Sequence, residues 1–366
     1  MIIRAKTQDL YQARPLTKKR AENTALNLLE MREGRSVLRS KPQRLVLELT
    51  NMCNLNCVMC GRNAAEITPV FFQVEWLERF HGIFDSIEEV TLMGWGEPTI
   101  HPRFPEMLKI TYDAGLRKYF CTNGMLLDEL EEDIFRCEAD LIAVSMDGAD
   151  AQTNAGIRRG VDFDKVVSAL RSIAARKKKE GLCYPHMNFV FTAMRSNIAQ
   201  LAAVVELAAD IGLNEVKVVF LTVFSPPLLG ESLYNEEALV ERHFNEAIAI
   251  AEERNLLLKL PHVRHTDPAG DKAHKDCYAA HRDLFIGADG YVRACMSSPE
   301  KLFHIDQYGR FEDLWNCAAY RKWRSCVNTP PSSPTGCRKC YQSSYANWNK
   351  EYAYNQVGEL FAPEWG

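Results

Sequence analysis

Leu45-Val46-Leu47-Glu48-Leu49-Thr50-Asn51-Met52-Cys53-Asn54-Leu55-Asn56-Cys57-Val58-Met59-Cys60 joins an apolar run to three cysteines. Four of the five residues at 45–49 are aliphatic, which favours a buried β-strand. The cysteines follow at the spacing Cys-x3-Cys-x2-Cys, with no fourth cysteine close by. Three thiolates in one loop can hold three irons of a cubane cluster and leave one iron with an open coordination position. Structural zinc fits poorly, because it usually takes four ligands in closely paired spacings, and three unrelated core cysteines are the other alternative.

Length, charge and cysteine content limit the class of protein. The 366 residues suffice for a principal domain and a smaller module. The net charge of −4 argues against a nucleic-acid partner, and no apolar run is long enough to span a membrane. The N-terminus lacks a signal-peptide core, so we expect a cytoplasmic protein. Twelve cysteines in such a compartment indicate metal or redox chemistry rather than disulfides.

Short apolar strands alternate with helical segments through the first two-thirds of the chain. The six expected strands are 45–49, 89–93, 118–121, 141–145, 187–191 and 216–220. The helical segments between them lie near 74–83, 104–113, 126–136, 163–178 and 200–211. This alternation is typical of βαβ units and a parallel sheet, so the fold class is α/β. Six units are fewer than the eight of a closed TIM barrel.

Polar and glycine-rich motifs stand where these strands end, which is where parallel α/β sheets bind their ligands. The second strand ends in Met93-Gly94-Trp95-Gly96-Glu97-Pro98, the third in Thr122-Asn123-Gly124 and the fourth in Ser145-Met146-Asp147-Gly148. The next helical region contains Ile157-Arg158-Arg159-Gly160. Each motif alone is weak, because glycine at strand ends is common turn chemistry. Because the motifs follow one another at successive strand ends, we expect them to form one shared site.

In this arrangement the chain resembles the radical S-adenosylmethionine (SAM) enzymes. The resemblance implies an open six-stranded partial TIM barrel and a [4Fe-4S] cluster held by Cys53, Cys57 and Cys60. It implies that the open iron chelates SAM, and that the reduced cluster cleaves SAM to a 5′-deoxyadenosyl radical that removes a substrate hydrogen. An external one-electron reductant, such as flavodoxin or ferredoxin, would then be a partner.

The resemblance also assigns SAM contacts. Gly94, Trp95, Gly96 and Glu97 match the segment that meets the SAM amino group. Glu97 could accept hydrogen bonds from that ammonium group, and the alternative is that its carboxylate bonds neighbouring backbone N–H groups.

Further contacts are expected from the later motifs. Ser145 and Asp147 match the positions near the ribose hydroxyls. Arg158 matches an arginine that faces the SAM carboxylate, where bidentate pairing is favourable, and Arg159 is its competitor. The remaining candidates for the SAM pocket are Met59, which replaces an aromatic residue usual in the family beside the adenine, Asn123, Asn188 and Leu221. Core packing explains the apolar ones equally well.

A second group of cysteines follows the strand–helix alternation. Cys277 and Cys295 frame a predicted β-hairpin at 284–293 whose Asp-Gly forms the turn. Cys337 and Cys340 form a Cys-x2-Cys after a segment, 311–325, that we expect to be helical. The pattern resembles the SPASM/twitch extension of radical SAM enzymes and implies one auxiliary [4Fe-4S] cluster held by these four cysteines. A four-cysteine zinc site is the alternative, and Cys326 could replace one of the ligands.

Three domains are expected from these patterns. Residues 1–40 form an N-terminal helical extension packed on the outside of the barrel. Residues 41–262 form the radical SAM partial barrel, and residues 263–366 form a small α+β module for the auxiliary cluster.

The resemblance leaves the reaction open. The main hypothesis is a dehydrogenase or epimerase acting on a sugar, cyclitol or nucleotide-linked small molecule, with the auxiliary cluster accepting an electron. An epimerase needs a hydrogen donor, for which Cys121 at the end of the third strand is the candidate; burial as a small hydrophobe is its alternative role. A maturase that crosslinks, oxidises or epimerises a ribosomally made peptide is the second hypothesis. A non-catalytic iron–sulfur or zinc protein is a remote third.

Overall fold

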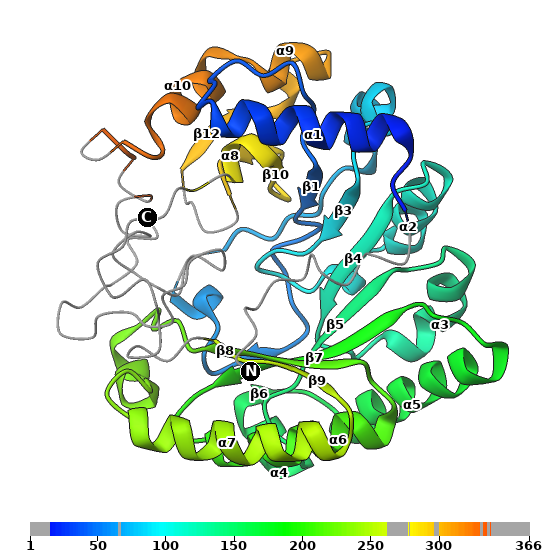
Figure 1. Cartoon of the computed structure of the whole chain (residues 1–366), viewed down its shortest axis with the longest axis vertical. Coiled ribbons are helices and arrows are strands. Elements are labelled where there is room, and N and C mark those ends of the chain that lie inside the picture. The colour runs from blue at the N-terminus through cyan, green and yellow to red at the C-terminus, as the bar shows by residue number, and fades with distance from the viewer. Residues whose placement is uncertain are drawn as a thin grey trace.

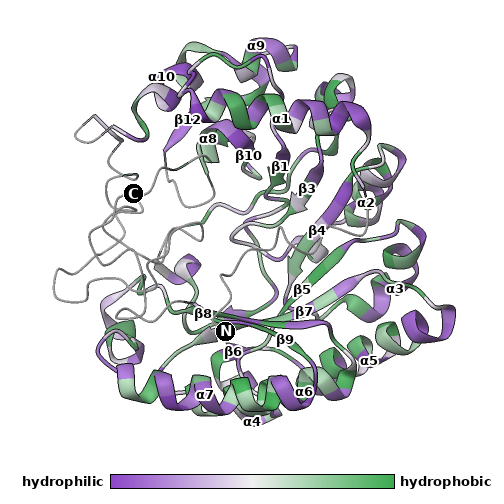
Figure 2. Ribbon diagram, viewed as in Figure 1, coloured by the Kyte–Doolittle hydropathy of each residue, from purple (hydrophilic) through white to green (hydrophobic). Residues whose placement is uncertain are grey.

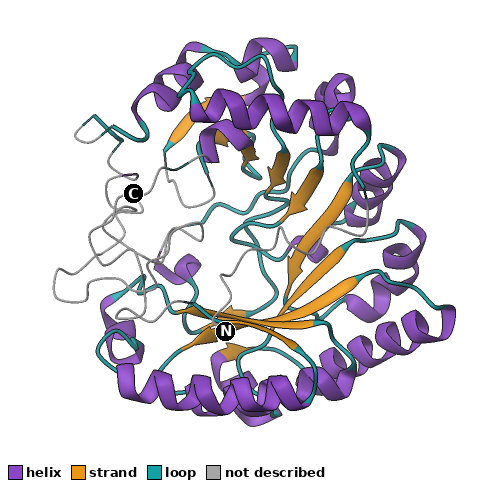
Figure 3. Cartoon of the chain, in the orientation of Figure 1, coloured by secondary structure: helices purple, strands orange, loops and turns teal. Residues whose placement is uncertain are grey.

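The computed structural model describes residues 15–64, 67–261, 277, 279–295, 300–329, 332–334 and 337. A ten-stranded sheet runs through it in the order β12-β11-β10-β1-β3-β4-β5-β7-β8-β9 (Figures 1 and 3). Its strands are β1 (Arg44–Leu47), β3 (Glu89–Leu92), β4 (Arg117–Thr122), β5 (Leu141–Ser145), β7 (His186–Ala193), β8 (Glu215–Phe220), β9 (Leu257–Lys259), β10 (Asp283–Ile286), β11 (Tyr291–Arg293) and β12 (Lys301–His304). Among the described residues the sheet is open, since β12 and β9 stand at its two edges.

The six predicted barrel strands are confirmed as β1, β3, β4, β5, β7 and β8. Each pairs with the next in parallel register, as βαβ connections require. A seventh parallel strand, β9, pairs with β8 and was not predicted. It has only three residues, too few for a recognisable apolar pattern.

The C-terminal strands continue the barrel sheet. The predicted hairpin forms β10 and β11, and β12 adds a third strand. Because β10 pairs with β1 in parallel, with Arg44 opposite Asp283, this module shares a sheet with the barrel. The domain boundary expected near residue 262 falls on residues outside the described part of the chain and stays a prediction.

The described residues form the helices α1 (Lys18–Arg32), α2 (Phe104–Asp113), α3 (Leu127–Arg136), α4 (Ala151–Ile157), α5 (Phe163–Glu180), α6 (Leu201–Ile211), α7 (Glu237–Glu253), α8 (Ala279–Arg282), α9 (Phe311–Trp315) and α10 (Ala318–Cys326). Three of these helices, α1, α4 and α5, begin at a residue whose side chain caps the helix. Asp162 caps α5 by accepting from Lys165 N, and Gly181 ends it in a left-handed conformation. The predicted helix at 74–83 is a 3-10 helix, η3 (Val74–Ile83).

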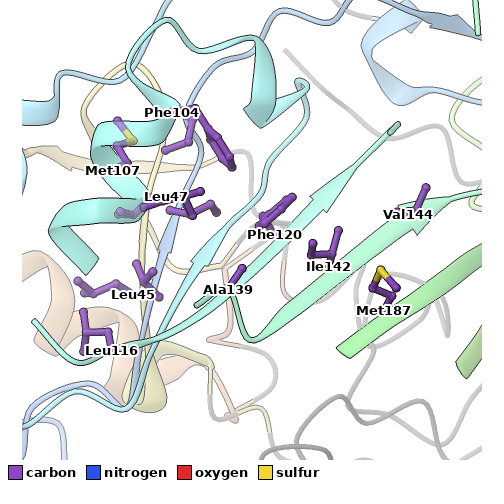
Figure 4. Packing of buried hydrophobic residues seen from close by; sticks show 14 of the residues in the cluster. Leu45, Leu47, Phe104, Met107, Leu116, Phe120, Ala139, Ile142, Val144 and Met187 are labelled. Carbon is purple, nitrogen blue, oxygen red and sulfur yellow. The ribbon is translucent and has the colours of Figure 1, made fainter. Parts of the chain in front are cut away.

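The main core lies between the sheet and the helices that cover its outer face. Figure 4 shows Leu47 and Phe120 beside Phe104 and Met107 of α2. Alternate strand residues therefore face the helices, and the others face the inner side of the sheet. Figure 2 shows hydrophobic and hydrophilic segments alternating along α5, α6 and α7, as expected for helices with one buried side.

Helix α1 packs at the amino ends of the barrel strands. Arg20 donates to Ala114 O at 2.9 Å and to Phe84 O at 3.1 Å, at the segments that lead into β4 and β3. Asn27 donates to His281 O at 3.0 Å, just before β10. The described part of the N-terminal extension, residues 15–40, thus lies at the end of the barrel away from the cysteine loop.

The segment at 311–325 was expected to be helical, and it forms two helices, α9 and α10. Between α9 and α10, Asn316 exchanges hydrogen bonds with the backbone of Leu38, accepting from its N at 3.0 Å and donating to its O at 2.8 Å. Trp315 Nε1 also donates to Ser40 O at 2.9 Å. These hydrogen bonds to residues distant in sequence stabilise the interruption between the two helices, which local helix propensity cannot predict. Among the described helices, none has the length and apolar character needed to cross a bilayer.

Candidate active site

The loop after β1 carries Cys53, Cys57 and Cys60 at the carboxyl edge of the sheet, and all three are half-buried. A two-residue strand, β2 (Asn56–Cys57), pairs with β6 (Arg158–Arg159) and sets Cys57 opposite Arg158. Leu55 N donates to Cys53 Sγ at 3.4 Å. Backbone pairing therefore fixes the loop where the strand-end motifs meet.

The environment of the thiols fits a cluster that stabilises thiolates. Burial raises the pKa of Cys57 to about 11 and also raises that of Cys53, and the neighbouring thiols oppose each other's ionisation. Bound iron would offset this cost, since a coordinated thiol is deprotonated. Within the described residues, no group of three or more His, Cys, Asp or Glu side chains is placed so that it could hold a metal ion. Three thiolates are the donors that a cubane cluster with one open iron takes, each binding a different iron.

Of the two candidate arginines, Arg158 points inward and Arg159 is exposed. Arg158 is 7% exposed; its Nη2 lies 2.7 Å from Asp147 Oδ2, and its Nη1 lies 3.9 Å from Cys57 Sγ. Burial lowers the pKa of Arg158, but Asp147 and the thiols more than offset this, so the net pKa is raised. Arg158 Nε has no hydrogen-bond partner among the described residues. A donor is therefore left for an anionic ligand.

Asp147, the candidate for a ribose contact, bonds protein groups, and its contact with a ribose stays a prediction. Its Oδ1 accepts from Thr192 N at 2.7 Å and its Oδ2 pairs with Arg158. The side chain is fully buried. In this structure Asp147 positions the arginine.

Gly94 and Gly96 allow the segment after β3 to approach the end of β1 and the cysteine loop closely. A Cβ on Gly94 would lie 2.3 Å from Glu48 Cγ, and one on Gly96 would lie 2.2 Å from Thr50 O. Trp95 N donates to Glu48 Oε1 at 2.8 Å. The glycines are thus required by the approach of the protein's own backbone. Their contact with the SAM amino group stays a proposal.

The carboxylate of Glu97 accepts hydrogen bonds from neighbouring residues. Such bonds were the alternative to a contact with the SAM ammonium group. The buried carboxylate accepts from Thr99 N at 3.1 Å, Thr122 Oγ1 at 2.7 Å and Asn123 N at 2.7 Å. Asn123 in turn places its Nδ2 3.9 Å from Cys53 Sγ. Glu97 therefore links the ends of β3 and β4 and holds Asn123 beside the cysteine loop.

The remaining candidates separate into two groups. Met59 and Leu221 belong to one apolar cluster with Ile157, at the edge where the cysteine loop meets the end of β8. Cys121 and Ser145 lie together on the inner face of the sheet, with Sγ 4.0 Å from Oγ. Asn188 is in register with this second group through Ala143, so it lies in the barrel interior and apart from Met59 and Leu221.

Glu48 was not singled out from the sequence as a site residue. It is buried, accepts from Trp95 N and accepts from Ala288 N at 3.3 Å. It therefore links the cysteine-loop edge of the barrel to the C-terminal module. The sequence feature that could have identified Glu48 is a carboxylate within an otherwise apolar predicted strand.

Three of the four predicted auxiliary ligands fall within the described residues, and Cys340 lies outside them. Cys277 N donates to Asn328 Oδ1 at 2.7 Å, and Asn328 Nδ2 returns a bond to Cys277 O at 3.1 Å. Cys295 follows β11. The thiol of the competitor Cys326 donates to Trp323 O at 3.5 Å within its own helix.

Known protein families match both parts of the chain. Residues 47–190 match the Radical SAM superfamily and residues 277–341 match SPASM, an iron-sulfur cluster-binding domain. This chain belongs to the radical SAM superfamily. Its cofactors are therefore SAM, the [4Fe-4S] cluster that binds SAM, and an auxiliary iron–sulfur cluster.

Two curated relatives of this radical SAM chain differ in how far they align. The mycofactocin maturase MftC of Mycobacterium tuberculosis is 31% identical over 176 residues, 47% of this chain and 43% of that protein. The AdoMet-dependent heme synthase of Methanosarcina barkeri is 28% identical over 348 residues, 88% of this chain and 95% of that protein. The chain spans less than two-thirds of the length of several of its other curated relatives.

Solved structures show the same fold. Streptococcus suis SuiB bound to S-adenosylmethionine superposes with a TM-score of 0.66 at 14% identity, covering 92% of this chain and 81% of SuiB. SuiB has also been solved with its precursor peptide SuiA, with a TM-score of 0.65 to this chain at 15% identity.

Proposed function

We propose that this radical SAM enzyme modifies a peptide substrate by abstracting a hydrogen atom from it. The observation that carries the radical chemistry is the buried Arg158–Asp147 pair beside Cys57, in the loop that carries all three cysteines. When bound, the reduced cluster supplies a 5′-deoxyadenosyl radical from SAM, and the auxiliary cluster can accept an electron from the substrate. The residues of the chain bind and orient these groups.

Each residue has a proposed task. Arg158 binds the SAM carboxylate through the donors that Asp147 leaves available. The Gly94–Gly96 segment borders the SAM amino group, while Glu97 holds Asn123 in place beside Cys53. Cys121, on the inner face beside Ser145, is the candidate hydrogen donor if the product is an epimer.

The comparisons favour a peptide over the sugar or cyclitol expected first. A maturase is among the curated relatives, and SuiB, which shares the fold, binds a precursor peptide.

A heme precursor is the second candidate substrate. The match to the heme synthase extends over nearly the whole of that protein, whereas the match to the maturase covers less than half of its length. The two candidates share the radical step and differ in the molecule from which hydrogen is removed.

One anaerobic assay separates the candidates. The reconstituted enzyme is incubated with dithionite, SAM and either synthetic copies of short peptides encoded beside its gene or an iron-porphyrin heme precursor. We expect 5′-deoxyadenosine and a peptide product that has lost two hydrogens, and no product with Cys57→Ala. A product from the porphyrin alone would establish the second candidate instead. No 5′-deoxyadenosine under any condition would contradict radical chemistry altogether. In deuterated water, deuterium on a product carbon would indicate an epimerase with a thiol donor.

A further inference from the structure

The side-chain amide of Asn123 lies beside the sulfur of Cys53, where the end of β4 meets the cysteine loop. Asn123 Nδ2 donates to Cys53 Sγ at 3.9 Å and to Asn54 Oδ1 at 2.7 Å. The two hydrogens of one amide nitrogen can serve both acceptors at once. Asn123 thus brings a hydrogen-bond donor to a predicted cluster ligand that is 70 residues away in the sequence.

The orientation of this amide is fixed by its oxygen. Asn123 Oδ1 accepts a hydrogen bond from Met125 N at 3.0 Å. A flipped amide would place its NH2 group against the N–H of Met125 and its oxygen against Asn54 Oδ1, so both of those bonds would be lost. The NH2 group therefore faces the sulfur.

The backbone of Asn123 is held in place as well. The carboxylate of Glu97 accepts from Asn123 N at 2.7 Å and from Thr122 Oγ1 at 2.7 Å. Thr122 Oγ1 in turn accepts from Gly124 N at 3.0 Å. Asn123 is only 5% exposed, and a buried hydrogen bond is electrostatically stronger than one in water. The amide is therefore a fixed and shielded donor.

The Cys53 sulfur changes its hydrogen-bonding role when iron is bound. As a free thiol it donates to Asn54 Oδ1 at 4.0 Å and accepts from Leu55 N at 3.4 Å. A coordinated thiol carries no proton, so it can no longer donate to Asn54 and acts only as an acceptor. Leu55 N and Asn123 Nδ2 both supply donors to it, and a substitution can remove the donor of Asn123.

A donor at a ligand sulfur stabilises the reduced form of an iron–sulfur cluster more than the oxidised form. Reduction adds one negative charge, which is shared with the sulfurs, and the partial positive charge of an N–H group attracts it. Hydrogen bonds to sulfur are accordingly among the factors that set the reduction potential of a cluster. Removal of the donor should therefore lower the potential.

We propose that Asn123 is a positioning residue whose N–H···S hydrogen bond to Cys53 raises the reduction potential of the SAM-binding cluster. The inference rests on the radical SAM part of the proposed function, with Cys53 as a ligand, and is independent of the substrate. This role differs from the contact with SAM expected from the sequence, because both polar atoms of the amide already have protein partners.

A redox titration followed by EPR tests the proposal without turnover. The reconstituted holoenzyme is reduced stepwise in the absence of SAM, and the SAM-binding cluster is identified as the one whose signal changes when SAM is added. Asn123→Leu has a side chain of similar volume without a donor. We expect the equilibrium constant for reduction of this cluster to fall about tenfold, which is about 59 mV for one electron. The auxiliary cluster should keep its potential.

Asn63→Leu is the matched control in the same loop. Asn63 Nδ2 donates to the backbone oxygen of Cys57 at 2.8 Å rather than to a sulfur, so the potential should equal that of the wild type. If Asn123→Leu does not retain its iron, Asn123→Asp replaces it, because a carboxylate still accepts from Met125 N but has no donor for the sulfur. Equal shifts at Asn123 and Asn63, or no shift at Asn123, would overturn the proposal.

Pulsed EPR gives a second measurement on the unaltered protein. The enzyme is made with asparagine that carries ¹⁵N in its side-chain amide, and the SAM-binding cluster is reduced. We expect a coupling between the cluster and an amide nitrogen, and the coupling should persist in Asn63→Leu. Absence of any such coupling in the wild type would contradict an N–H···S bond from Asn123.

Three outcomes separate this inference from the proposed function. Asn123→Leu should bind SAM within about twofold of the wild type, and a loss of SAM affinity without a shift in potential would replace the proposal with a direct SAM contact. Full iron content in Cys53→Ala would remove both the ligand and the proposal. A shifted potential in an enzyme that modifies neither peptide nor porphyrin would count against the proposed substrates and leave the role of Asn123 standing.

Discussion

The guanidinium of Arg158 lies 2.7 Å from the carboxylate of Asp147, and both side chains are buried beside the cysteine loop. The pair brings together β6 and the end of β5. The pairing also distinguishes two adjacent arginines, because Arg158 is buried at the site whereas Arg159 is exposed.

Arg158→Lys is expected to weaken SAM binding at least about tenfold, since an ammonium group cannot serve Asp147 and a carboxylate with the geometry of a guanidinium. Equilibrium binding of SAM to the anaerobically reconstituted enzyme measures this. Arg159→Lys is the matched control and should bind SAM as the wild type does. Equal effects of the two changes would show that Arg158 does not contact SAM.

Removal of single cysteines is expected to change the iron content in steps. Two four-iron clusters give about eight irons per chain, and Cys57→Ala or Cys295→Ala should each leave about four. Only Cys57→Ala should also abolish cleavage of SAM in the absence of substrate. Metal analysis and 5′-deoxyadenosine assays check the two outcomes. One zinc and about four irons in the wild type would instead identify the C-terminal site as zinc.

Gly96→Ala is expected to displace the cysteine loop. The added Cβ would lie 2.2 Å from Thr50 O and 2.3 Å from Met52 O, and backbone atoms cannot move aside as a flexible side chain can. We expect loss of the SAM-binding cluster, to about four irons per chain, with the C-terminal cluster retained. Gly156→Ala in α4 is the control, because nothing lies within 4 Å of its added Cβ. Full iron content in Gly96→Ala would show that the loop tolerates the displacement.

Buried His281 is expected to make folding stability depend on pH. Burial lowers the pKa of His281 from 6.5 to about 4, with a further contribution from Arg324. The unfolded chain therefore binds more protons between these values, and the stability contributed by the neutral ring is present above pH 6.5 and lost as the pH falls toward 4. Between pH 7 and 5 this amounts to about 2 kcal/mol.

Urea unfolding of wild type and His281→Gln at both pH values measures this difference. The variant should lose about 2 kcal/mol less than the wild type on acidification. His81→Gln, at an exposed position of η3, should behave as the wild type. The same slope in all three proteins would assign the pH dependence to other groups.

Much of the fold was predictable from local pattern. Each strand from β1 to β8 in the barrel sheet was recognised as an apolar run, because strands buried on both faces are almost continuously hydrophobic. β9 was missed because three residues carry too little pattern, and the break at Asn316 was missed because its bonds go to Leu38, far away in the sequence.

The roles of polar residues were less predictable than their location. Glu97 and Asp147, both candidates for SAM contacts, bond protein groups from neighbouring strands, and their contacts with SAM stay predictions. Glu48 was not singled out, although it contacts two segments of the site. Strand-end motifs indicate where a site lies, but the partner of each carboxylate depends on residues that sequence spacing does not reveal.

The sequence by itself determined the cluster loop and the alternating α/β order, because cysteine spacing and apolar periodicity act over a few residues. Only the tertiary structure decided that Arg158 faces inward, that Asp147 holds it, and that Glu97 links the ends of two neighbouring strands. Those outcomes depend on the register between strands that are distant in sequence, which sets the face and the partners of every side chain.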